Sequence, residues 1–335
     1  MYKKNQSLDD YLRVLTDVLR PAEDRLLDDL VACESGLPTV IKIGSPRVGG
    51  TLLTQWASSG NLFYNPTNLH SRFYAVPIVG AIINKLIGDP SLDYRDEFSD
   101  VCRELSFDSS IGKTAGLLAP HEFWYFWRHF LHISDVPELN GMFLEKSDFS
   151  GFGKSLKAIQ RVEGKSLFLK GHLVNFQLEA FDSKMSDMIY FHLKRSILDT
   201  ARSLYKARIE WTGSADNWFS HKPPEYTRLK DLDPCYQVVG QIYFIEREMQ
   251  RVAPLLGDRY LSVNYVDFCS QPSEVYVQLA ERMNSLAHDQ VQPHYDGPQG
   301  FIASKKSDRL LDVKLQEALS YFIKEYGEVD TYEAV

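Results

Sequence analysis

The stretch TVIKIGSPRVGGTLLTQW, residues 39–56, joins an apolar segment, a glycine-containing loop and the start of a helical pattern. Residues 39–43 are predicted to form a buried strand and residues 44–50 a tight loop, and from Thr51 onward the apolar residues follow helical spacing. The amide groups of such a loop and of the helix N-terminus converge on one point, where they favour phosphate or sulfate. The segment therefore predicts an anion-binding element.

This loop is similar to the nucleotide-binding P-loop, G-x4-G-K-[ST], but differs at one position. Gly44, Gly49 and Thr51 fit the pattern, whereas Gly50 replaces the lysine, so ATP or GTP chemistry loses its usual cation. Arg47 supplies a cation from within the loop, and its planar guanidinium suits a phosphate or sulfuryl group. The alternative is a glycine turn that only packs a strand against a helix.

The composition is that of an ordinary globular protein, with 44% hydrophobic and 24% charged residues among 335. The formal net charge of −8 argues against broad binding of nucleic acids or acidic membranes. The sequence shows neither an N-terminal signal core nor an apolar stretch long enough to span a bilayer. We therefore expect a cytoplasmic protein with no nucleic-acid partner and no integral membrane segment.

The four cysteines are too scattered for a metal site or a disulfide framework. They are Cys33, Cys102, Cys235 and Cys269. We expect buried thiols, which fit a reducing compartment.

Further apolar segments after the loop alternate with helical patterns. Such alternation predicts an α/β fold of three layers, with a central parallel sheet flanked by helices. The expected strands cover residues 166–170, 188–193 and 259–266, and the expected helices cover residues 175–181, 197–209, 273–283 and 310–326.

We expect a single domain over residues 1–335 with three additions. Residues 1–36 form a helical extension, with Ser7 as a candidate N-cap of the helix. Residues 60–160 are an aromatic-rich helical insertion, and residues 289–309, rich in Pro, Gly, Ser and Lys, are a candidate lid loop.

A second feature is the strand end Phe-Leu-Lys-Gly-His at residues 168–172. The carboxyl ends of parallel strands line the ligand crevice, so Lys170 and His172 should face the anion loop. Histidine titrates near neutral pH, which makes His172 the best candidate for a general base. The alternative is a hydrogen-bonded histidine at a strand end.

A third feature is Arg195, which ends another strand and precedes Ser203 by eight residues. The guanidinium and the hydroxyl on the following helix can bind one phosphate together. A solvated helix face is the alternative.

Together, the three features resemble the sulfotransferases that use 3'-phosphoadenosine 5'-phosphosulfate (PAPS). The family's loop Pro-Lys-x-Gly-[Thr/Gly]-Thr is matched by residues 46–51 with arginine in place of lysine, and its Lys-x-His strand end is matched by residues 170–172. Its element Arg-x-Pro-x-Asp-x3-Ser is matched by Arg195, Asp199 and Ser203, although Ile197 replaces the proline. A looser match, Tyr-Val-Asp-Phe at residues 265–268, looks like the family's Tyr-Glu-Asp-Leu.

The resemblance implies a P-loop-like sulfotransferase architecture, PAPS as co-substrate, adenosine 3',5'-bisphosphate as product, and no required metal. It also implies His172 as the base, with Arg47 and Lys170 stabilising the transferred group. The implied donor-binding residues are Ser45, Pro46, Arg47, Val48, Gly49, Gly50, Thr51 and Leu52 around the 5' side, Arg195 and Ser203 at the 3'-phosphate, and Lys305 and Lys306 in the lid.

The family places its acceptor-binding segments between the loop helix and the Lys-x-His strand. The aromatic run at residues 121–128 suits sugar rings, phenols and apolar molecules alike, so the acceptor is a small molecule, a carbohydrate or a lipid-like molecule with a hydroxyl or, second, an amine. A helix buried against the sheet is the alternative. The candidate residues here are His121 and Glu122 as alternative bases and His70, Arg72, Phe123 and Trp127 as acceptor contacts.

Two other functions are weighed against this one. A divergent P-loop kinase would bind magnesium-ATP, and a non-catalytic nucleotide-binding module would bind the nucleotide without turnover. The sequence leaves the oligomeric state open.

Overall fold

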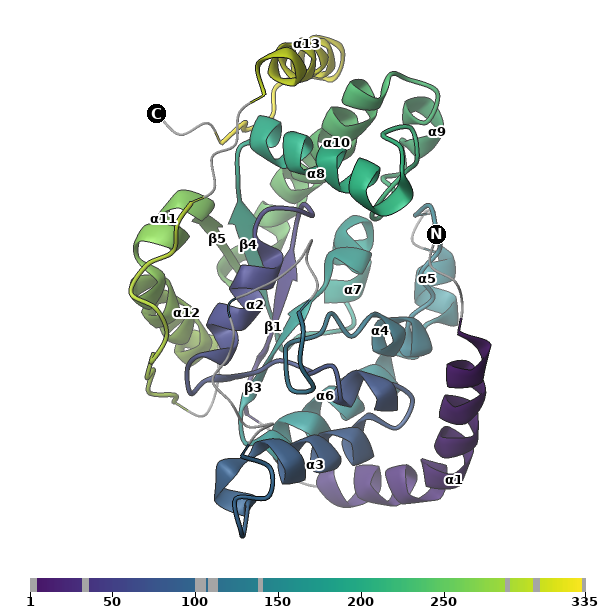
Figure 1. Cartoon of the computed structure of the whole chain (residues 1–335), viewed down its shortest axis with the longest axis vertical. Coiled ribbons are helices and arrows are strands. Elements are labelled where there is room, and N and C mark those ends of the chain that lie inside the picture. Colours follow the sequence, from purple (N-terminus) through teal and green to yellow (C-terminus); the bar gives the residue numbers. More distant parts are fainter. Residues whose placement is uncertain are drawn as a thin grey trace.

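The computed structural model describes residues 5–31, 36–99, 107, 114–137, 141–286, 290–303 and 308–332. Its centre is a parallel five-stranded sheet with the strand order β2-β3-β1-β4-β5 (Figure 1). The strands are β1 (Thr39–Ile43), β2 (Phe63–Tyr64), β3 (Ser166–Lys170), β4 (Met188–Lys194) and β5 (Tyr260–Asn264). The predicted three-layer α/β fold with a central parallel sheet is confirmed.

Helices surround this sheet on both faces. They are α1 (Gln6–Val31), α2 (Gly50–Ser58), α3 (Pro77–Gly88), α4 (Trp124–Phe130), α5 (Gly141–Lys146), α6 (Phe149–Glu163), α7 (Leu178–Asp182), α8 (Ile197–Thr212), α9 (Tyr226–Leu229), α10 (Pro234–Leu256), α11 (Tyr265–Ser270), α12 (Pro272–Leu286) and α13 (Arg309–Tyr326). Short 3-10 turns are η1 (His70–Phe73), η2 (Pro90–Leu92), η3 (His172–Gln177) and η4 (Gly257–Arg259).

The strands β1, β3 and β4 are buried on both faces, which explains their nearly continuous apolar sequences. Val40 and Phe168 point to the face covered by α2, α11 and α12, and Ile41 and Leu169 to the face covered by α4, α6, α7 and α10. Figure 1 shows α11 and α12 on one side of the sheet and α4, α6 and α7 on the other. Alternation along each strand thus builds two cores back to back.

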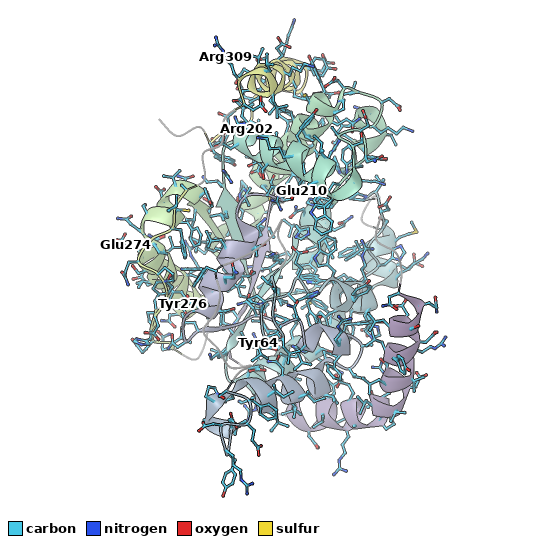
Figure 2. The ribbon with its side chains drawn as sticks, viewed as in Figure 1. Tyr64, Arg202, Glu210, Glu274, Tyr276 and Arg309 are labelled. Atoms are coloured by element: carbon cyan, nitrogen blue, oxygen red, sulfur yellow. The ribbon has the colours of Figure 1, made fainter. Side chains whose placement is uncertain are left out.

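Aromatic rings dominate the core on the α2 side. Trp56 of α2 meets the rings of Phe268 and Tyr276 edge to face, at centroid distances of 5.3 and 5.5 Å, a favoured aromatic geometry. The hydroxyl of Tyr276, labelled in Figure 2, accepts a hydrogen bond from the Leu62 N–H at 2.8 Å. These contacts fix α2, and with it the loop before α2, on the sheet.

Two sequence expectations need correction, and two elements were missed. The strand predicted over residues 259–266 is shorter, because Tyr265 begins α11 instead of continuing β5. The N-cap prediction for Ser7 is wrong: α1 begins at Gln6, and Asn5 Oδ1 accepts the Leu8 N–H at 3.1 Å. The strand β2 and the helix α10 were not predicted at all.

The described part of the candidate lid, residues 290–303, packs against the rest of the chain. The Phe301 N–H donates to the Cys269 carbonyl at 2.7 Å, and the Tyr295 ring lies 5.3 Å from that of Tyr276. Lys305 and Lys306 lie outside the described residues, so their role in donor binding stays a prediction.

Cys235 and Cys269 are free and buried, as expected, whereas Cys33 and Cys102 lie outside the described part of the chain. In the segments that the structure describes, no helix combines the length and the apolar character needed to cross a bilayer.

Candidate active site

The loop between β1 and α2 is shaped by backbone conformations that favour glycine. Gly44 and Gly49 have φ values of 84° and 97°, and Arg47 also has a positive φ, of 65°. A Cβ at Gly44 would lie 2.5 Å from the His192 ring, and a Cβ at Gly49 would lie 2.6 Å from the Tyr265 ring. Both the backbone and the neighbouring rings therefore require glycine at these two positions.

We expect Gly49→Ala to destabilise the protein by about 2–3 kcal/mol, because left-handed backbone strain and a clash with a buried ring add up. Gly164→Ala is the matched control: its φ is 68°, but its Cβ would meet nothing within 4 Å. That variant should lose only about 1 kcal/mol. Urea unfolding of both variants measures the difference, and equal losses would show that the Tyr265 ring moves aside at no cost.

Beneath the loop lies a buried polar network. Lys42 Nζ donates to the Ser45 carbonyl at 2.7 Å and, more weakly, to the Gly44 carbonyl at 3.4 Å. The Ser45 hydroxyl donates to Glu246 of α10, and His192 Nε2 lies 3.0 Å from the other carboxylate oxygen of Glu246. The Gly44 carbonyl and the Ser45 N–H belong to the same peptide group and point in opposite directions. Because the Gly44 carbonyl points toward Lys42, the Ser45 N–H points away from it.

The charges of this network depend on one another. Burial lowers the pKa of Lys42 to about 7, although Glu246 acts in the opposite direction. Burial alone would raise the pKa of Glu246, but His192, Ser45 and Lys42 outweigh it and lower that pKa. The buried carboxylate of Glu246 thus favours the charged form of Lys42 beneath the loop.

Of the Lys-x-His strand end, Lys170 reaches the loop as predicted, whereas the described ring contacts of His172 are with Trp124 and His221. Lys170 Nζ lies 3.4 Å from Thr51 Oγ1, and a Cβ at Gly50 would lie 3.7 Å from Lys170 Cε. Lys170 and its sheet partner Lys42 therefore bring ammonium groups to the position at which the loop lacks its lysine. Lysine side chains from two adjacent strands thus approach Gly50.

Glu122 pairs with Lys170 at 3.0 Å. Burial alone would raise the pKa of Glu122, but the charges of Lys170 and His172 outweigh it and lower that pKa to about 2. Glu122 is therefore an ionised partner of the lysine at neutral pH and a weak proton acceptor.

The third sequence feature meets the loop on another side. Arg47 Nε donates to Ser203 Oγ on α8 at 3.4 Å, and the Arg195 guanidinium lies 4.6 Å from the centre of the Tyr265 ring, which packs against Gly49. Burial lowers the pKa of Arg47, and Glu210, labelled in Figure 2, acts in the opposite direction. Two arginines thus concentrate positive charge at the loop of an acidic protein.

His172 lies in a buried aromatic setting next to this cationic region. Its ring packs edge to face on Trp124, with centroids 4.8 Å apart, and lies 5.3 Å from the ring of His221. Burial lowers the pKa of His172 to about 4. The imidazole is therefore neutral at physiological pH and able to accept a proton.

The remaining sequence candidates lie in different surroundings. His121 Nδ1 accepts the Phe123 N–H at 2.9 Å, and burial lowers its pKa. His70 is fully buried, with its ring nitrogens bonded to the Tyr64 hydroxyl (labelled in Figure 2) at 2.7 Å and to a backbone carbonyl at 2.8 Å. Arg72 is exposed. Their catalytic or acceptor roles stay predictions.

Phe123 and Trp127 belong to the hydrophobic core, and only 1% or less of either residue is exposed. The aromatic residue that contacts His172 is Trp124, which stands between them in the sequence. Of the other loop candidates, Val48 is buried, and Pro46 and Leu52 are half-buried.

Sequence reasoning missed four polar residues that the structure places here: Lys42, Asn175, His221 and Glu246. The one sequence signal was Lys42, a lysine inside the apolar strand TVIKI. Asn175, His221 and Glu246 come from segments whose position next to the loop depends on the tertiary fold.

No protein-family model and no curated protein matches this chain. Among solved structures it is similar to sulfotransferase STF9 from Mycobacterium avium, with 16% identity and a TM-score of 0.49 over 95% of this chain and 75% of that chain. Sulfotransferase STF1 from Mycobacterium tuberculosis H37Rv has 11% identity and a TM-score of 0.48 over 95% and 79%, respectively. A sulfotransferase domain from the curacin biosynthetic pathway has 16% identity and a TM-score of 0.41 over 75% of both chains. Likenesses this distant say nothing about the reaction of this chain.

Proposed function

We propose that this chain is a sulfotransferase that moves a sulfuryl group from PAPS to a hydroxyl group, or less readily to an amine. The observation that carries the proposal is the meeting of three separate sequence features at one loop. Lys170 contacts Thr51 and Arg47 contacts Ser203, although each pair is more than a hundred residues apart in sequence. A glycine turn with only a packing role does not need this gathering of cations.

In the proposed complex the loop and the N-terminus of α2 hold the 5'-phosphosulfate. Backbone N–H groups at a helix N-terminus are suited to such an anion. Arg195 and Ser203 bind the 3'-phosphate, where a guanidinium and a hydroxyl provide directed donors. We also keep the prediction that donor binding requires no metal. The positive charge that a metal would supply comes instead from Arg47, Arg195 and the lysines Lys42 and Lys170.

The transfer is an in-line displacement at sulfur. His172 accepts the proton of the attacking hydroxyl, while Lys170 and Arg47 stabilise charge on the sulfuryl and leaving-phosphate oxygens. Each such donor contributes roughly 10²–10³ in rate in comparable oxyanion sites. Glu122 orients Lys170 through its ion pair at 3.0 Å.

In this proposal the acceptor binds next to His172, beside the ring of Trp124. An aromatic edge beside a neutral imidazole suits a sugar ring, a phenol or a lipid-like alcohol. We therefore keep a small molecule, a carbohydrate and a lipid-like molecule as acceptor classes.

Calorimetric titration with adenosine 3',5'-bisphosphate and with ATP, each with and without magnesium, tests the donor class without knowledge of the acceptor. We expect the bisphosphate to bind without magnesium and more tightly than ATP. Preference for magnesium-ATP would favour the divergent kinase, and binding of neither would leave a loop without nucleotide function. Bisphosphate binding without turnover against any acceptor would fit the non-catalytic module.

The same titration on Arg195→Ala locates the 3'-phosphate. Loss of a charge-assisted hydrogen bond should weaken bisphosphate binding by about 10–100-fold. Arg228→Ala is the control, because Arg228 is an exposed arginine on α9 and should leave the affinity unchanged. An unchanged affinity in Arg195→Ala would show that the 3'-phosphate lies elsewhere.

A further inference from the structure

Asn175 in η3 is a fully buried amide that holds the first residue of the anion loop. Its Oδ1 accepts the Gly44 N–H at 3.0 Å, and its Nδ2 donates to the Gly44 carbonyl, also at 3.0 Å. One side chain thus binds both polar groups of a single backbone residue, and Asn175 fixes where the loop leaves β1.

These two bonds determine the protonation of a neighbouring histidine. A backbone N–H can only donate and a carbonyl can only accept, so Gly44 fixes which atom of the Asn175 amide is nitrogen. His221 Nε2 lies 3.3 Å from that nitrogen and must therefore be an acceptor without a proton. The proton of His221 then resides on Nδ1, which lies 3.3 Å from Ser220 Oγ.

The segment that carries His221 is held firmly by buried polar groups. Gln241 Nε2 of α10 donates to the His221 carbonyl at 2.7 Å, and Arg208 of α8 donates to Gln241 Oε1 at 3.0 Å. Arg208 and Gln241 are fully buried. Ser220 has a φ of 71°, a strained conformation for a serine, just before the histidine. The structure therefore holds the backbone at His221 in one position, from which its ring reaches Asn175.

We propose that His221 is a positioning residue of the anion loop: its neutral, Nδ1-protonated form accepts a hydrogen bond from Asn175 and so keeps Asn175 in place on Gly44. Its ring also lies against that of His172, so the same side chain orients the loop and the proposed base. The inference rests on the proposed function only for the identity of the ligand.

Protonation of His221 would place an N–H against the Asn175 NH₂ group and remove the hydrogen bond. Among the described residues, the ionisable groups that act on the pKa of His221 are His172 and Lys42, and both lower that pKa. Burial accordingly lowers the pKa of His221 well below its usual value. Protonation of His221 at acidic pH should therefore break its hydrogen bond to Asn175 and weaken the hydrogen bonds between Asn175 and Gly44.

The first test needs no ligand. Two-bond ¹H–¹⁵N correlation spectra of the wild-type protein with ¹⁵N-labelled histidine, assigned through the signal missing in His221→Gln, report the tautomer. We expect an unprotonated Nε2 and a protonated Nδ1 at pH 7. The opposite tautomer would overturn the inference whatever the protein binds.

The second test compares two variants. In His221→Gln the side-chain oxygen can take the place of Nε2 as an acceptor, whereas His221→Phe keeps a ring and offers no acceptor. Phenylalanine should shift the Gly44 amide resonance and weaken adenosine 3',5'-bisphosphate binding about tenfold, the effect of one buried hydrogen bond. Glutamine should restore the resonance and bring the affinity within about twofold of wild type.

Equal losses in both variants, or an unmoved Gly44 resonance in His221→Phe, would show that His221 only fills space. If the wild-type protein binds no bisphosphate, the proposed function fails, but the tautomer and the Gly44 resonance still decide this inference.

Discussion

Replacing His172 with alanine is expected to lower turnover by about 10²–10⁴-fold, the usual contribution of a general base. Affinity for adenosine 3',5'-bisphosphate should stay within about twofold, because the described contacts of His172 are with Trp124 and His221 and not with the loop. Steady-state kinetics with any accepted hydroxyl substrate, together with calorimetry, separates the two quantities.

The pH profile gives a second measurement of the same role. A base must be unprotonated, and the pKa of His172 is lowered to about 4. The kcat/KM of the wild-type enzyme should therefore keep its neutral-pH value down to about pH 5 and fall as the pH drops through about 4. An acidic limb near pH 6.5 would assign the base to an unperturbed histidine.

Glu122→Gln and His121→Ala test the two alternative bases, which both lie close to Lys170. Glu122 is ionised and paired, so we expect its replacement to change turnover by less than about tenfold. If His172→Ala retained full turnover while one of these variants lost it, that residue would be the base.

The largest effect on stability is expected from Glu246→Ala. The variant leaves Lys42 without its counter-charge, His192 without its carboxylate and the Ser45 hydroxyl without its acceptor, all in a buried region. Breaking such a buried network costs about 3–5 kcal/mol. Urea unfolding at pH 7 measures this loss, and Glu248→Ala, with only an ion pair to Arg251 on the same helix, should lose about 0–1 kcal/mol.

The pH dependence of stability checks the same network. The pKa of Glu246 is lowered in the folded state, so its carboxylate stabilises the fold above about pH 4.5 and this contribution is lost as the pH falls through the lowered value. Wild type and Glu246→Ala should therefore approach each other in stability under acid. A constant difference down to pH 3 would contradict the assigned charge.

Local sequence was sufficient for the central strands. The predicted segments 39–43 and 166–170 agree with β1 and β3 at both ends, because strands buried on both faces are mostly apolar and a glycine follows each of these two strands. The sequence also predicted that Lys170 and His172 would face the loop, since the carboxyl ends of parallel strands share one edge of the sheet, and Lys170 lies beside Thr51.

The predictions failed where packing between distant elements decides the structure. The helix α10 brings Glu246 to Ser45 of the loop and Gln241 to the His221 carbonyl, and no motif marks either residue. Phe123 and Trp127 were candidate acceptor contacts, with a helix buried against the sheet as the alternative; both lie in the core, and Trp124 of α4 lies beside His172. Short-range patterns carry no information on which face of a short helix meets the sheet.

By itself, the sequence determined a parallel α/β fold and a glycine loop between the first strand and its helix, because strand burial and glycine turns are encoded by neighbouring residues; anion binding by that loop stays a prediction. Only the tertiary structure decided how that loop is supported, through Lys42, Glu246, Asn175 and His221. The physical reason is that a buried polar group is stable only with a partner, and here most of the partners lie far apart along the chain.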